Sequence, residues 1–376
     1  MNKKLLTAAI GAALIAGPMW AQADVKLYGR VHVSVDYLDA RANTQPHSNK
    51  ATTVSSNASR WGLDISEKLG GGLTAIAKLE QQVNADGDSN SQDARNRYVG
   101  LSGKWGTILA GTHDTPFKDV SRAVELFPEQ IGDLRNIVNA GGNFGGAFAS
   151  RGWDLRPPNS ILYRSPSLNG FVAEYQYSAD IIAATGTEDN RRRADSLGLK
   201  YAKGPLYVAY ARESHRLPLT HGGDPTETGD RLGASYNFGA FKVMALWQSL
   251  KNMGGTEPGN MSSVNRKSWT LGGAFTAGNN VFKAQYAKAD DVSNSLSGAS
   301  GADTGAKMWA IGWDHLFSKT VKAYVAYAKT DNASLQNLGV NGTGPGSTVV
   351  DVRSDSVAPG AGGDPSAWSV GMIVDF

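Results

Sequence analysis

Apolar and polar side chains alternate with a period of two along most of the sequence. From Val25 to Tyr37 the odd positions are apolar or glycine, and the even positions carry polar groups. The chain ends on the same pattern, from Trp368 to Phe376. Because successive side chains of a strand point to opposite faces, this period predicts strands that separate an apolar medium from a polar one.

The pattern recurs between the two ends and predicts many antiparallel strands. It is clearest in segments 60–65, 73–80, 171–178, 196–201, 231–238, 268–275, 282–286 and 309–314. Short glycine- and asparagine-rich turns alternate with long polar stretches, which is typical of outer-membrane barrels. Counting strands around these connections gives about sixteen, enough to enclose an aqueous channel. We therefore predict an all-β fold, a transmembrane antiparallel β-barrel over residues 24–376.

The first 23 residues have the features of a signal peptide. Lys3 and Lys4 precede an apolar run over 5–16, which is too short to span a bilayer. Ala21-Gln22-Ala23 then follows the small-x-small rule for cleavage. We expect cleavage between Ala23 and Asp24, and export to the outer membrane of a Gram-negative cell.

Composition narrows the function. The chain has no cysteine, which excludes a secreted protein stabilised by disulfides. A formal net charge of +3 is too small to indicate a surface that binds nucleic acid. No stretch after residue 23 is apolar enough for a membrane helix. A soluble β-sandwich is the remaining alternative fold, and it would need several domains at this length.

One long polar stretch, the third, differs from the others. Residues 113–158 contain a helix-like segment over 117–126, and their first half concentrates acid, at Asp114, Asp119, Glu125, Glu129 and Asp133. The polar strand faces carry bases instead: Arg30, Arg60, Lys78, Arg164, Lys242, Lys283 and Lys322. If this third loop folds inward, its carboxylates face a basic wall across a narrow passage. Low-dielectric walls would then focus a transverse field across the channel.

Several short motifs, in order, resemble one family. They are Lys26-Leu27-Tyr28-Gly29-Arg30, Ser59-Arg60-Trp61-Gly62, Tyr98-Val99-Gly100-Leu101, Pro128-Glu129, Gly132-Asp133, Tyr163-Arg164 and the terminal Phe376. The chain from Val25 to Phe376 is similar to the general diffusion porins of Gram-negative bacteria, which are sixteen-stranded trimers. This resemblance implies a homotrimer and an inward third loop that sets the pore size. It also implies that Phe376 is a signal for the barrel-assembly machinery.

The resemblance further implies a constriction of wall bases facing loop acids. The wall residues carried over are Arg30, Arg60, Arg95 and Arg156, and the loop acids are Glu125, Glu129 and Asp133. Lys78, Arg97 and Arg164 join the candidate wall. Arg95 and Arg97 share phase with apolar Val99 and Leu101, so simple alternation points them outward. Either a β-bulge or a protein–protein face would reconcile the two readings.

No motif for catalysis or for a cofactor stands out. The sequence Asp86-Gly87-Asp88-Ser89-Asn90 begins like a calcium loop, but the turn glycine and the final glutamate are missing. We expect no metal, no cofactor and no enzymatic activity. The predicted function is passive diffusion of small hydrophilic solutes and ions with weak anion preference, in contact with outer-membrane lipid. The alternatives are an outer-membrane barrel hydrolase or an adhesin.

Overall fold

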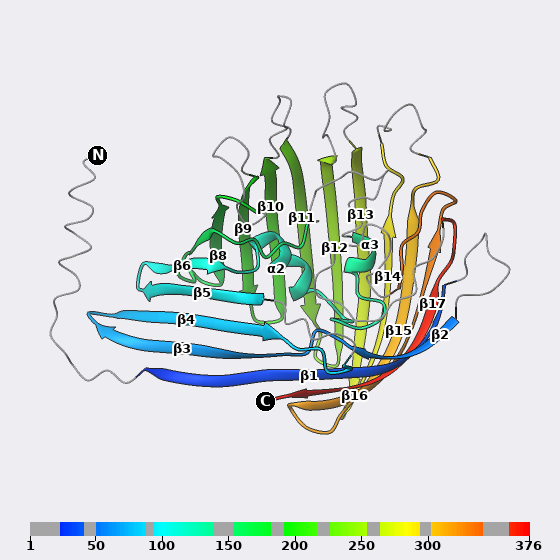
Figure 1. Cartoon of the computed structure of the whole chain (residues 1–376), viewed down its shortest axis with the longest axis horizontal. Helices are drawn as coiled ribbons and strands as arrows, with labels where there is room; N and C mark the ends of the chain where they lie inside the picture. The colour runs from blue at the N-terminus through cyan, green and yellow to red at the C-terminus, as the bar shows by residue number, and fades with distance from the viewer. Residues whose placement is uncertain are drawn as a thin grey trace.

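The computed structural model describes residues 23–40, 50–87, 94–138, 153–181, 192–216, 226–253, 264–293, 302–340 and 361–376. They form one antiparallel sheet of 17 strands around two short helices (Figure 1). The strands are β1 (Asp24–Asp39), β2 (Lys50–Ser56), β3 (Arg60–Gly70), β4 (Leu73–Gln82), β5 (Ala94–Gly103), β6 (Gly106–Thr112), β7 (Ser160–Arg164), β8 (Phe171–Ser178), β9 (Arg193–Lys203), β10 (Leu206–Arg216), β11 (Thr226–Asn237), β12 (Phe241–Met253), β13 (Val264–Ala277), β14 (Asn280–Ala289), β15 (Ala306–Leu316), β16 (Val321–Asn332) and β17 (Ser366–Asp375).

The sheet closes into a barrel, as the sequence predicts. β17 pairs with both β16 and β1, so neither end of the sheet is left as an edge. β2 and β3 both pair with β1, β2 along its second half and β3 along its first half. These two strands therefore share one position in the wall, and the 17 strands fill sixteen positions. The prediction of about sixteen strands is confirmed.

The break between β2 and β3 lies within residues 38–58, a polar stretch that the sequence predicts as a long loop. Lys50–Ser56 has no continuous apolar face to reveal a strand, yet it pairs with β1 over Val33–Asp39. Ala58 adopts a positive φ of 53° at the break. The Arg60 guanidinium donates to the Ala58 carbonyl at 2.9 Å, so the break helps to fix the first side chain of β3.

The two-residue alternation places apolar side chains on the outer face. Val25, Leu27 and Val35 are exposed there, whereas His32 and Asp36 on the opposite face of β1 are buried inside the barrel. An apolar outer surface and a polar interior suit a barrel in lipid.

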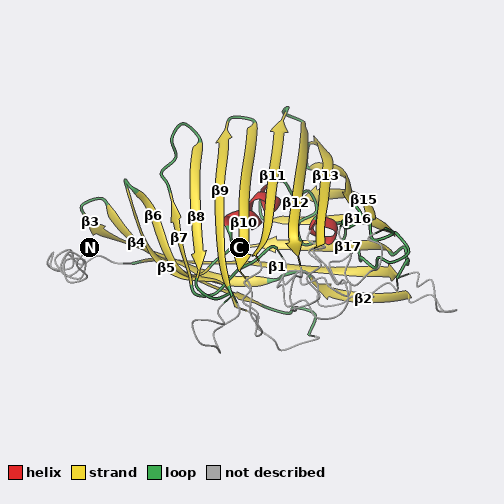
Figure 2. Ribbon diagram, turned by 90° about the horizontal axis from the view of Figure 1, so that it is seen from above, coloured by secondary structure: helices red, strands yellow, loops and turns green. Residues whose placement is uncertain are grey.

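Two helices of the third loop lie inside the ring of strands, which Figures 1 and 2 both show. Helix α2 (Pro116–Ala123) contacts β8 to β11, and α3 (Arg135–Val138) contacts β13 to β15. Thr115 caps α2 by accepting a hydrogen bond from the Lys118 N–H at 3.2 Å. None of the helices among the described residues is long and apolar enough to cross a membrane.

Candidate functional site

Small residues of the barrel wall let the third loop approach closely. A Cβ atom on Gly198 would lie 2.8 Å from the Cβ of Pro116, and one on Gly233 would lie 2.9 Å from a methyl of Val120. Gly272 faces Leu126 and Gly312 faces Phe127 in the same way. A side chain at any of these inward positions would collide with the loop. The glycines therefore set the depth to which the loop enters the lumen.

A buried ion pair fixes both limbs of the loop to the wall. Arg231 of β11 donates to Asp154 at 2.6 Å, to the Phe117 carbonyl at 3.0 Å and to the Ser121 hydroxyl at 3.1 Å. Burial would raise the pKa of Asp154, but Arg231, Arg135 and Lys118 together outweigh burial and lower that pKa. Arg231 thus joins the outgoing helix and the returning limb.

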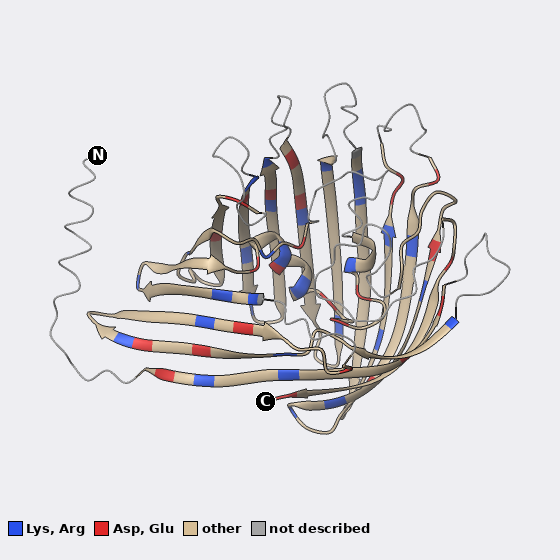
Figure 3. Cartoon of the chain, in the orientation of Figure 1, with Lys and Arg blue, Asp and Glu red and all other residues tan. Residues whose placement is uncertain are grey.

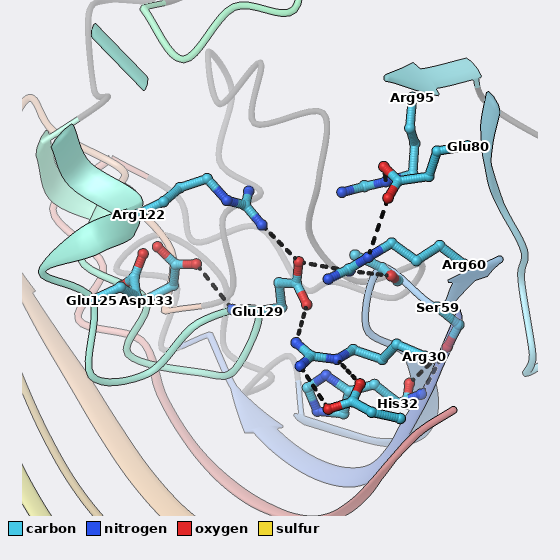
Figure 4. A network of polar contacts seen from close by, with 12 residues as sticks. Arg30, His32, Ser59, Arg60, Glu80, Arg95, Arg122, Glu125, Glu129 and Asp133 are labelled. Atoms are coloured by element: carbon cyan, nitrogen blue, oxygen red, sulfur yellow. Dashed lines mark hydrogen bonds and ion pairs between the residues drawn. The ribbon is translucent and has the colours of Figure 1, made fainter. Parts of the chain in front are cut away.

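The tip of the loop presents one carboxylate to three guanidinium groups (Figure 4). Glu129 lies 2.9 Å from Arg60 and 3.3 Å from Arg30, both on the wall, and 3.0 Å from Arg122 of α2. Its side chain is fully buried between these groups. Glu129 adopts a positive φ of 61°, which turns the chain at the tip.

The electrostatic balance at Glu129 favours the charged form. Burial alone would raise the pKa of this carboxyl group, but Arg60, Arg122 and Arg30 together outweigh burial and lower its pKa to about 2. The side chains of Arg30 and Arg122 remain 24% and 25% exposed, whereas the carboxylate is 0% exposed. The accessible surface of this cluster is therefore positive.

Further ion pairs continue from this cluster along the wall. Arg30 donates to both carboxylate oxygens of Asp375 on β17, at 2.6 and 3.0 Å. Arg95 lies 2.7 Å from Glu80, and Arg60 lies 3.9 Å from the same carboxylate. Together with Arg122 and Glu129, these groups are four bases and three acids, which leaves one positive charge.

A β-bulge resolves the orientation of Arg95 and Arg97. The register between β4 and β5 shifts between Leu79 and Gln81. Arg95 consequently points inward and is buried against Glu80. Arg97 stays in phase with exposed Val99 and donates to Gln81, away from the lumen. The prediction that Arg97 belongs to the pore wall is therefore wrong, because the bulge precedes it and normal alternation resumes.

Glu125 and Asp133 do not face the barrel wall as expected. Both acids form ion pairs with Arg135, which belongs to the loop itself. Glu125 lies 3.4 Å from the Arg135 guanidinium, and Asp133 lies closer to it. Asp133 also accepts from the Glu129 N–H at 3.2 Å, which braces the tip. Burial, together with the neighbouring Asp133, raises the pKa of Glu125 well above its usual value. These two acids shape the loop, and only Glu129 of the three reaches the wall arginines.

Three further predicted bases have partners other than Glu129. Arg156 is in the returning limb rather than on a strand, and it lies 2.9 Å from Asp114. Arg164 points inward from β7 beside the short turn and pairs with Glu174. Lys78 lies 2.8 Å from Asp64.

Sequence reasoning missed three bases that organise the site. Arg122 and Arg135 lie in the loop, where the sequence pattern singles out the acids, and Arg231 follows the ordinary polar phase of its strand. Arg122 occupies the last turn of α2, where its side chain reaches Glu129 at 3.0 Å. The available signal was the position of both bases among the acids of the loop, Arg122 between Asp119 and Glu125 and Arg135 two residues after Asp133.

The described residues contain no group of three or more His, Asp or Glu side chains arranged to hold a metal ion. In the calcium-like stretch, Asp86 accepts from the Ser56 N–H at 2.7 Å, and 88–90 lie outside the described residues.

Comparisons with known proteins agree with the fold. A Gram-negative porin family model matches residues 6–335. Outer membrane porin protein 32 of Delftia acidovorans is 30% identical, over 92% of this chain and 93% of that protein. The solved anion-selective porin from Comamonas acidovorans is 24% identical, with a TM-score of 0.75 over 94% of this chain and 100% of that one. The trimer form of OmpT from Vibrio cholerae is 16% identical, with a TM-score of 0.65 over 94% and 99% of the two chains.

Proposed function

The chain belongs to the Gram-negative porin family, and on that premise we propose that its constriction gives the channel a weak anion preference. The protein is an outer-membrane porin whose water-filled lumen lets small hydrophilic solutes and ions diffuse across. A barrel hydrolase or an adhesin is not favoured by this membership. We further infer that the protein is no enzyme, because diffusion requires neither a covalent step nor a cofactor.

One observation carries the proposed selectivity. Three guanidinium groups surround the single buried carboxylate of Glu129. The part of this cluster that solvent can reach belongs to the arginines. A passing anion meets donors of Arg30 and Arg122, whereas a passing cation finds the acid enclosed. Charge focused in a narrow, low-dielectric passage acts on ions most strongly there.

Two acids limit the preference to a weak one. The carboxylates of Asp64 and Asp375 are 46% and 38% exposed, although each pairs with a base. These exposed carboxylates attract cations along the same wall and so offset part of the attraction of the arginines for anions. The description of the Comamonas acidovorans relative as anion-selective supports the direction of the proposal.

The test is the reversal potential of purified protein in a planar bilayer across a KCl gradient. We expect the sign that corresponds to chloride passing more readily than potassium. A reversal potential of the opposite sign would contradict the proposed selectivity while leaving the channel itself intact.

We also propose a homotrimer, for which the trimer form among the structural relatives is the support. Openings in three equal steps per inserted unit are the expected conductance record. Independent single steps would argue for monomeric channels.

Two further proposals concern export and assembly. Residues 1–23 are proposed as a cleaved signal peptide, and 1–22 lie outside the described residues. Phe376 is proposed as the recognition residue for the barrel-assembly machinery. Its backbone closes the seam through mutual hydrogen bonds with Gly29, at 2.9 and 3.0 Å.

A further inference from the structure

Trp153, in the returning limb of the third loop, is the largest fully buried side chain among the described residues. Its ring centroid lies 5.6 Å from that of Phe117 in α2 and 4.4 Å from that of His215 in β10. The Trp153 and His215 rings are stacked, with 24° between their planes. A Cβ atom on Gly229 of β11 would lie 2.7 Å from Cζ3 of Trp153, so a side chain there would collide with the indole. Phe117, His215 and Gly229 thus form a socket for Trp153.

His215 lies between two carboxylates inside the barrel, near the long-loop ends of β10 and β11, where Figure 3 shows acidic bands. Its Nε2 atom lies 2.9 Å from Oε1 of Glu213, two positions away on the same face of β10. Its Nδ1 atom lies 3.5 Å from Oε2 of Glu227, which is directly opposite in the β10–β11 register. All three side chains are at most 1% exposed. Their charges must therefore be balanced by one another rather than by solvent.

This geometry favours the protonated form of the His215 ring. A neutral imidazole has one N–H group and can donate to only one of the two glutamates. An imidazolium donates from both nitrogens, and its charge offsets that of the buried carboxylates. The same positive charge lies against the face of the Trp153 indole, which attracts cations. The contacts with the glutamates and the contact with the tryptophan thus depend on one proton.

The other charges of the neighbouring strands point away from the ring. Arg193 of β9 and Arg216 of β10 are opposite each other in register. Because the adjacent Ala194 and His215 are buried inside, strand alternation places both arginines on the outer side. The inward neighbours of His215 and Glu213 on β9 are Ala194 and Ser196, which carry no charge.

The charges of the third loop next to the socket are held in other ion pairs. Asp154, the residue after Trp153, lies 2.6 Å from Arg231 of β11. Lys118 of α2 lies 3.0 Å from Asp114. The two glutamates are therefore the groups that decide whether the ring beneath Trp153 carries a proton.

We propose that His215 is a positioning residue of the third loop: its imidazolium, between Glu213 and Glu227, stacks against Trp153 and holds the returning limb on the barrel wall. When the ring gives its proton to solvent, two buried carboxylates lose their common cation and the indole faces a neutral ring. The socket is then destabilised and the limb moves into the lumen. The limb is held at neutral pH and released as the solution becomes alkaline, because the deprotonated form is the released one.

The first test is an NMR titration of the histidine rings in the detergent-solubilised protein. The chain has six histidines, and labelling their imidazoles with ¹⁵N reports the protonation of each ring. We expect one ring to remain an imidazolium at about pH 8, where an ordinary histidine with a pKa of about 6.5 is neutral. That signal should be absent from His215→Gln. If every histidine of the unmodified protein is neutral at about pH 8, the proposal is overturned without recourse to any variant.

The second test records single-channel currents as a function of pH. The unmodified protein should give quiet currents at about pH 7 and several-fold greater current noise towards about pH 10, as His215 loses its proton. His215→Gln should be noisy throughout and show no alkaline step. In Glu213→Gln/Glu227→Gln the ring lacks both counter-ions, so the step should move down towards about pH 6.5. Trp153→Leu should be noisy at every pH, because the ring then has nothing to hold.

His315→Gln is the matched control for these recordings. His315 lies near the short-turn end of β15, where its Nδ1 atom is 2.9 Å from Oδ1 of Asn280. This variant should keep the pH profile of the unmodified protein. An alkaline step that persists in His215→Gln, a step that does not move in Glu213→Gln/Glu227→Gln, or quiet currents in Trp153→Leu would each overturn the proposal. The sign of the reversal potential is a separate measurement, so the proposed anion preference stands or falls independently.

Discussion

Glu129 of the third loop accepts a hydrogen bond from Arg60 of the barrel wall at 2.9 Å. The two residues are 69 positions apart in the chain. Arg60 follows the break in the wall strand, where it also donates to the Ala58 carbonyl. The contact therefore joins the tip of the loop to an irregularity of the wall, and it fixes where the charges of this cluster lie.

Replacing Arg60 with Glu should reduce the proposed anion preference. The substitution changes the wall by two units of charge and places an acid beside Glu129. One unit charge about 8 Å from an ion in water contributes about 0.5 kcal/mol, so we expect the chloride-to-potassium permeability ratio to fall roughly two- to fivefold. The reversal potential in a KCl gradient measures the change.

Arg97→Glu provides the matched control for this experiment. Arg97 lies on the outer face beyond the bulge, so the same change of charge should leave the permeability ratio unaltered. An unchanged ratio in Arg60→Glu, or an equal fall in both variants, would remove Arg60 from the pore lining.

Glu129→Gln should increase anion preference at neutral pH. The variant leaves three guanidinium groups without their common carboxylate, and we expect the permeability ratio to rise roughly twofold or more. Because the pKa of Glu129 is lowered to about 2, its charge persists below the range in which an ordinary glutamate takes up a proton. It is lost only as the pH falls towards about 2.

The pH series separates this group from other acids. Wild type and Glu129→Gln should differ in reversal potential near neutral pH and still at about pH 4, then converge as the pH approaches about 2. Convergence already at about pH 4.5 would mean that the arginines do not hold the carboxylate in its charged form.

The sequence was sufficient to predict the barrel because lipid imposes a pattern that each strand must show. Val25 to Tyr37 carries this alternation in full, and its outward and inward sides match the structure. Lys50–Ser56 was missed because the pattern is absent there: its strand is held by pairing with β1, and no apolar face reveals it.

The site was predictable only where one residue decides the geometry. Arg60 and Arg30 follow the strand phase, so their inward direction was readable. The inward turn of Arg95 depends on a bulge between Leu79 and Gln81, which is a property of two strands together. The pairing of Asp133 with Arg135 depends on how the loop folds on itself, and no local period records that.

Asp133→Asn should destabilise the loop more than Glu125→Gln does. Arg135 is 1% exposed, and without Asp133 its nearest ion-pair partner is Glu125 at 3.4 Å, a carboxyl group whose pKa is raised by burial. Breaking a buried pair from one side costs about 3–5 kcal/mol. A glutamine at 125 can still accept the Leu134 N–H, so we expect a cost of about 1 kcal/mol.

Hydrogen exchange of the backbone amides over 129–138 compares the two variants. Faster exchange in Asp133→Asn than in Glu125→Gln is the expected order. The reverse order would mean that Glu125 is the main partner of Arg135.

Arg231→Met should loosen the loop while the barrel remains closed. The substitution removes the donors to Asp154, the Phe117 carbonyl and Ser121, and it leaves Asp154 buried without its main base. Loss of one partner from such a pair costs about 3–5 kcal/mol. We expect larger and noisier single-channel currents, together with faster hydrogen exchange in α2.

Arg212→Met is the control for that variant. Arg212 pairs with Asp230 at 2.8 Å on the neighbouring strands, but its side chain is 51% exposed and does not touch the loop. Currents that stay quiet in Arg231→Met, or noise of the same size in Arg212→Met, would show that the buried pair does not hold the loop.

Phe376→Gly tests whether the terminal aromatic residue acts in assembly or only in the seam of the barrel. The variant keeps the two backbone hydrogen bonds with Gly29 but removes a ring that is 57% exposed and covers that glycine on the outer face. Because the ring buries little apolar surface, refolding into detergent should be almost unchanged, at a cost of about 1 kcal/mol. Assembly in cells, measured as heat-modifiable protein in the outer membrane, should fall several-fold if the machinery recognises the ring.

Deletion of Phe376 removes the backbone bonds as well and should lower both measurements. Unchanged assembly of Phe376→Gly in cells would leave the seam as the role of this residue, because a recognition signal cannot be lost without consequence where recognition is required.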